Sequence, residues 1–112
     1  MVGKLIKIFR QKKGIGVMEL AKKLKINRIS LFRIEKGQRC PSEKIAIKAF
    51  KTFGLSEENI YQVFVFNELF KYGKLSKKFG DKETKLFLSR LNKKDENGMI
   101  IYRYFKKTLS PK

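Results

Sequence analysis

Residues 17–37, with the sequence VMELAKKLKINRISLFRIEKG, constrain the fold more than any other stretch of the chain. Three apolar residues in the first half recur at the spacings of one helix face, namely Leu20, Ala21 and Leu24. Asn27 is a good N-cap after a break at 25–27. Gly37 suits the left-handed residue that ends a helix. The stretch therefore predicts two short helices, about 17–24 and about 28–36, joined by a tight turn.

The second of these helices has a buried side and an outer side. Leu31 and Ile34 give it an apolar face. Five residues fall on its front and outer side, namely Arg28, Ile29, Ser30, Phe32 and Arg33. Two short helices joined by a turn, with arginines pointing outward from the second, are the arrangement that places a helix in the major groove of DNA.

Patterns outside this stretch predict further helices. Their ranges are 2–12, about 43–53, about 57–71 and about 82–93, the last three beginning after Ser42, Ser56 and Asp81 as N-caps. The helix at 57–71 is apolar nearly all round, so we expect it to be buried on more than one side. It is either a spine between two regions or a dimer surface.

The segment MIIYRYF at 99–105 is compatible with a helix or a strand. The preceding Asn97-Gly98 pair is typical of a turn, and β-branched and aromatic residues favour a strand. Ile101, Phe105 and Leu109, however, stand at i, i+4 and i+8. We favour the helix, because the other patterns of the chain are helical.

The chain is strongly basic along its whole length. Its 112 residues carry 28 Lys and Arg against 10 Asp and Glu, a net charge of +18. The charge is shared between 1–66, net +10, and 67–112, net +8, so it is not a basic tail. A polyanionic partner, a membrane surface or a lysine-rich proteome would each account for it. Such a surface binds nucleic acid nonspecifically at low salt.

The sequence predicts a cytoplasmic, nucleoid-associated protein that is not an enzyme. A single cysteine, Cys40, excludes an internal disulfide. No apolar run has the length of a signal peptide or a membrane span. Histidine is absent, metal-ligand clusters are lacking, and the serines have no plausible general base. We therefore expect no catalytic residues, no metal, no cofactor and no membrane partner.

Several short motifs keep a common spacing over residues 3–66. They are Gly3, Ile6–Arg10, Lys13-Gly14-Ile15, Glu19-Leu20-Ala21, Ile26-Asn27, Ile34-Glu35-Lys36-Gly37, Pro41-Ser42 and Gly54-Leu55-Ser56. With this pattern the chain resembles the lambda repressor and Cro family of helix-turn-helix regulators, the XRE type. The resemblance implies an all-α fold with a five-helix DNA-binding head at 1–66. We expect 67–112 to be a mostly helical extension that completes the core and pairs subunits.

The resemblance also implies an ion pair between Arg10 and Glu35 that holds the second helix of the motif at a fixed angle. Two residues depart from the family pattern. Val17 stands where the family has a phosphate-binding glutamine, so backbone N–H groups at that helix start would take over. Lys25 replaces the glycine of the turn, where a left-handed conformation is unfavourable for lysine.

DNA contacts are expected on two groups of residues. The base-contact candidates are Arg28, Ile29, Ser30, Phe32 and Arg33, with Arg28 and Arg33 suited to guanine. The phosphate-contact candidates are Val17, Lys13, Lys36, Gln38, Arg39 and Lys44. Ile29 is expected to touch a thymine methyl or to pack on a neighbour, and Phe32 to contact DNA or a protein. Aromatic residues of the second half favour core or dimer packing over base stacking.

The hypothesis drawn from the sequence is a sequence-specific regulator of transcription, most simply a repressor, that binds double-stranded DNA as a homodimer. Two rivals remain open. One is a nonspecific basic nucleic-acid-binding protein, which predicts a steep salt dependence. The other is a protein-interaction module that has kept the fold.

Overall fold

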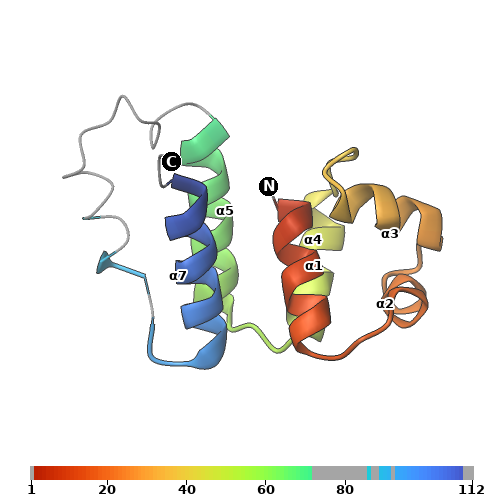
Figure 1. The fold of residues 1–112 in the computed structure, drawn as a ribbon, viewed down its shortest axis with the longest axis horizontal. Helices are drawn as coiled ribbons and strands as arrows, with labels where there is room; N and C mark the ends of the chain where they lie inside the picture. The colour runs from red at the N-terminus through yellow and green to blue at the C-terminus, as the bar shows by residue number, and fades with distance from the viewer. Residues whose placement is uncertain (1, 72–85, 87–88, 92, 110–112) are drawn as a thin grey trace. The chain divides into compact units, whose positions relative to one another are not determined.

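The computed structural model describes residues 2–71, 86, 89–91 and 93–109, and the regular structure in this part of the chain is helical throughout. The helices are α1 (Val2–Lys12), α2 (Val17–Leu24), α3 (Arg28–Glu35), α4 (Glu43–Thr52), α5 (Glu57–Lys71) and α7 (Glu96–Leu109) (Figure 1). The predicted all-α fold is confirmed. The predicted helix at 82–93 lies mostly outside the described residues.

The chain forms two compact units, Met1–Ser56 and Glu57–Lys112. The first holds α1 to α4 and the second holds α5 and α7. The boundary predicted from the sequence between residues 66 and 67 stays a prediction, and it falls within α5, which is continuous from Glu57 to Lys71. Helix α5 lies along α7 within the second unit (Figure 1).

Local signals set the ends of the helices in the first unit. The Asn27 side chain accepts a hydrogen bond from the Ser30 backbone N–H at 2.7 Å, and Ser42 caps α4 in the same way. Lys25 has φ 57°, so the turn between α2 and α3 does require a left-handed residue. Gly37, at φ 79°, provides the left-handed residue after α3, and glycine has no Cβ atom that makes this conformation unfavourable.

Phenylalanines and aliphatic residues fill the core of the first unit. Helix α1 packs against α3 and α4, and α2 packs against the same two helices. Phe9 stacks on Phe53, with ring centroids 5.9 Å apart, and meets Phe50 edge-on. The other fully buried side chains of large volume here are Leu5, Ile6, Leu20 and Leu31. This core holds α2 and α3 in place.

In the second unit α5 and α7 pack through aromatic and aliphatic side chains. The rings of Phe66 and Phe105 stack 3.7 Å apart, and Val63 and Ile101 are buried. The predicted helix at 99–105 is confirmed within α7. No helix in the described part of the chain is long and apolar enough to cross a membrane.

The turn predicted at Asn97-Gly98 is wrong. Both residues lie in the first turn of α7, which begins at Glu96. The Asp95 carboxylate accepts a hydrogen bond from the Gly98 N–H at 2.6 Å. This is the bond of an N-cap residue to the third residue of a helix. The Asn-Gly pair therefore follows the start of a helix, where glycine is tolerated.

Candidate nucleic-acid interface

Helix α3 has one face in the core and one face in solvent. Leu31 and Ile34 are buried, as the sequence predicted. On the outer side Arg28, Ile29, Phe32 and Arg33 are exposed and Ser30 is half-buried. Of the base-contact candidates, four are therefore accessible to a partner and the fifth partly so.

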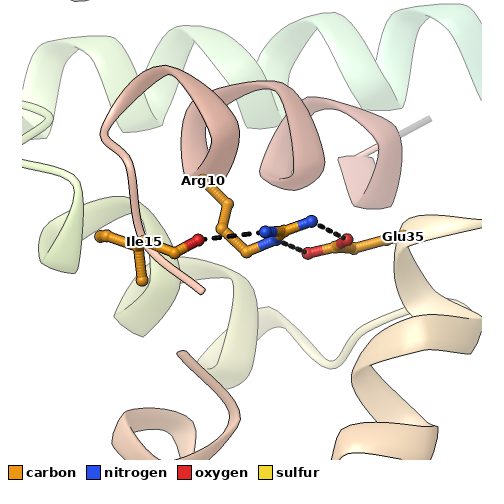
Figure 2. Close-up of polar contacts among 3 residues, drawn as sticks. All are labelled: Arg10, Ile15 and Glu35. Carbon is orange, nitrogen blue, oxygen red and sulfur yellow. Dashed lines mark hydrogen bonds and ion pairs between the residues drawn. The ribbon is translucent and has the colours of Figure 1, made fainter. Parts of the chain in front are cut away.

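An ion pair ties α3 to α1. Arg10 Nε and Nη2 donate to the two carboxylate oxygens of Glu35 at 2.7 Å and 3.1 Å, while Nη1 donates to the Ile15 carbonyl at 3.0 Å (Figure 2). The side chains are only 11% and 6% exposed. The expected pair between Arg10 and Glu35 therefore exists, and it is bidentate, which fixes direction as well as distance.

A close backbone approach also fixes α3 on α1. A Cβ atom added to Gly3 would lie 1.9 Å from the carbonyl oxygen of Ile34, much closer than atoms can approach. Only a residue without a side chain allows α1 to come this near to α3. The orientation of α3 therefore depends on Gly3 as well as on the ion pair.

The loop after α3 contacts the outer face of this helix. Arg39 donates to the Ser30 hydroxyl at 3.2 Å, and the Lys36 ammonium stands 5.0 Å from the centroid of the Phe32 ring. In each of these two contacts, a phosphate-contact candidate (Arg39 or Lys36) lies next to a base-contact candidate (Ser30 or Phe32). Sequence reasoning missed both contacts, because loop geometry decides them.

An apolar hollow of about 210 Å³ lies between the start of α2 and the outer face of α3. Val17, Arg28, Ile29 and Phe32 line it. Sequence reasoning assigned Val17 to a phosphate contact and did not foresee the hollow. Gly16, the N-cap of α2, provides no side-chain hydrogen bond to the first turn.

The remaining phosphate-contact candidates are exposed near the ends of helices. Lys13 lies in the turn after α1, Gln38 lies in the loop after α3, and Lys44 lies in the first turn of α4. Exposed basic side chains beside helix ends are able to bind phosphate oxygens. Cys40, the single cysteine, is also exposed in the loop after α3.

Comparisons with known proteins identify the family of this chain. A family model described as helix-turn-helix matches residues 6–60. An uncharacterised HTH-type transcriptional regulator of Methanocaldococcus jannaschii is 39% identical over 56 residues, which are 50% of this chain and 85% of the relative. The chain belongs to the helix-turn-helix family. This confirms the resemblance drawn from the sequence, with α2 and α3 as the two helices of the motif. No solved structure gave a significant match.

Proposed function

We propose that this helix-turn-helix protein regulates transcription by placing α3 in the major groove of DNA. The observation that carries the proposal is the outer face of α3, where Arg28 and Arg33 are exposed opposite the buried Leu31 and Ile34. A helix presented in this way fits the width of the groove. The family and the printed name of the relative support the same function.

Within this function the side chains divide by role. Arg28 and Arg33 read bases, since a guanidinium pairs with guanine O6 and N7. Ile29, Ser30 and Phe32 face the same groove, with Ser30 oriented by Arg39. Lys13, Lys36, Gln38, Arg39, Lys44 and the backbone at Val17 bind phosphates. Phosphate contacts set the affinity and the register of the protein on the duplex.

We also propose that the protein acts as a homodimeric repressor on a palindromic operator. We assign subunit pairing to the second unit, most of which lies beyond the matched residues 6–60. Two-fold pairing would set the two α3 helices about 34 Å apart, one turn of DNA. A dimer bound at a promoter blocks transcription by occupancy.

Selection of binding sites from random duplexes, followed by footprinting, tests the proposal. The wild-type protein should enrich one sequence. On that sequence Arg28→Ala and Arg33→Ala should each lose about 1–3 kcal/mol of binding free energy and accept more bases at one position. Lys44→Ala should weaken binding to all sequences alike. If the arginine variants also weaken binding equally on every sequence, direct readout by these residues is wrong.

The net charge of +18 favours a second candidate function, nonspecific binding of nucleic acid. Affinity measured against salt concentration separates the two. A nonspecific binder loses affinity steeply with salt and binds the selected and random duplexes alike. A specific regulator keeps a preference of about a thousandfold or more for its site at physiological salt.

A further inference from the structure

The apolar hollow beside α3 exposes side chains that usually avoid water. Ile29 is 58% exposed and Phe32 is 52% exposed, and both line the hollow together with Val17 and the stem of Arg28. The hollow is open to solvent, and the exposed Arg28 of α3 lines it. Covering such a surface with an apolar group of a partner is favourable.

The charges around the hollow restrict that occupant. Arg28 forms part of the wall, and the Lys36 ammonium stands 5.0 Å from the Phe32 ring centroid. In α2 and α3 the acidic residues are Glu19 and Glu35, and Glu35 is buried against Arg10. This basic rim repels the same basic surface of a second copy of the chain, so two copies do not pair through the hollow. It attracts an anionic partner that carries small apolar groups.

DNA has these properties in its major groove. Base edges there present hydrogen-bond donors and acceptors, and the apolar group among them is the C5-methyl of thymine. If α3 enters the groove, Ile29 and Phe32 face base edges while Arg28 stays within reach of a neighbouring base or phosphate. Apolar contact with the thymine methyl is a known means of distinguishing bases.

We propose that the hollow formed by Val17, Ile29, Phe32 and the Arg28 stem receives the methyl group of a thymine, so that the protein requires thymine at the facing position of its site. The inference rests on the proposed function and adds a specificity element to it. Apolar contact, and not a hydrogen bond, selects that base.

Replacing a thymidine of the duplex by deoxyuridine removes this methyl group and leaves the hydrogen-bonding edge of the base unchanged. Fluorescence anisotropy should be measured on the selected duplex with each thymine replaced singly. At the facing position the Kd of the wild-type protein should rise about fourfold, the equivalent of one buried methyl group at about 0.8 kcal/mol. In Ile29→Ala and Phe32→Ala the ratio of the two Kd values should fall to about one.

Met18→Ala is the matched control. Met18 is an apolar residue of α2 that is 68% exposed and does not line the hollow. This variant should keep the fourfold ratio. Because the substituted side chains are exposed, all three variants should unfold at the wild-type temperature, which circular dichroism can check.

Two results would overturn the inference without touching the proposed function. One is specific binding to a site that contains no thymine, or to a site at which no thymine replacement changes the Kd. The other is a methyl effect that persists in Ile29→Ala and Phe32→Ala, since the methyl is then read elsewhere. If no duplex is bound specifically, the proposed sequence-specific function fails, and the inference fails with it.

Discussion

The contact between Arg10 and Glu35 shows how a single pair of side chains controls the orientation of a helix. Both groups are almost fully withdrawn from water, and the guanidinium also donates from Nη1 to the Ile15 carbonyl. Burial of this kind costs desolvation energy that a lone charge cannot recover. The contribution of the pair to stability is therefore best measured by removing one partner.

We expect Arg10→Met to lower the free energy of unfolding by about 3–5 kcal/mol, because Glu35 is left as an unpaired buried carboxylate. Urea denaturation followed by circular dichroism measures this. Glu19→Gln, which changes an exposed carboxylate on α2, should stay within about 0.5 kcal/mol of wild type. The double variant Arg10→Met, Glu35→Leu should lose clearly less than the single variant. A loss below about 1 kcal/mol in Arg10→Met would contradict the structural role of the pair.

Lys25 carries backbone strain in the turn between α2 and α3. Its φ of 57° lies in the left-handed region, which costs a residue with a Cβ about 1–2 kcal/mol. Part of this free-energy cost is offset because the backbone of lysine loses less conformational entropy on folding than that of glycine does.

Lys25→Gly should therefore raise the free energy of unfolding by about 0.5 kcal/mol. Thermal melting of the two proteins in the same buffer measures the difference. Lys22→Gly, an exposed substitution inside α2, should instead lower stability by about 1 kcal/mol. A Lys25→Gly protein less stable than wild type would show that the lysine side chain stabilises the turn in some other way.

Whole helices were predicted well where local chemistry decides them. The caps at Asn27 and Ser42 and the glycine at position 37 place the ends of α3 and α4 within one or two residues. The prediction failed at Asn97-Gly98, because Asp95 begins α7 just upstream. The partner of α5 was also missed, since the stacking of its aromatic residues on α7 is a contact between distant segments.

The close packing of α1 on α3 allows a prediction about a substitution at the contact between these two helices. Gly3→Ala should force α1 away from α3, because the new methyl group would overlap the Ile34 carbonyl. We expect a loss of about 1–3 kcal/mol in urea denaturation, and weaker binding of DNA. Gly16→Ser is the control, since nothing lies within 4 Å of the added Cβ and serine can cap α2. It should be neutral or stabilising. A Gly3→Ala protein of unchanged stability would contradict the close approach.

For the chain in its entirety, the sequence predicted the fold class and the DNA-binding motif more completely than the site. Charge and motif spacing identify α3, but the hollow at Val17 and the contact of Arg39 with Ser30 depend on how α2, α3 and the following loop meet. Such contacts follow from tertiary packing and leave no periodic pattern in the residues.

Pairing of two chains on one duplex is testable with the 112-residue chain. If the homodimer proposal is correct, a palindrome with half-site centres one helical turn apart should bind two chains. Inserting about five base pairs moves one half-site to the opposite side of the helix. Affinity should then fall at least tenfold, as measured by anisotropy, while insertion of a full turn should restore part of it. Equal affinity for all three spacings would argue for independent monomers.

Cys40 gives such experiments a practical advantage. It is the single cysteine of the chain and is exposed in the loop that follows α3. A nitroxide or fluorophore attached to its thiol therefore marks one defined point in the loop after α3 without any prior mutation. In a paired assembly two such labels would report one distance, and spectroscopy would follow the spacing of the α3 helices directly in solution.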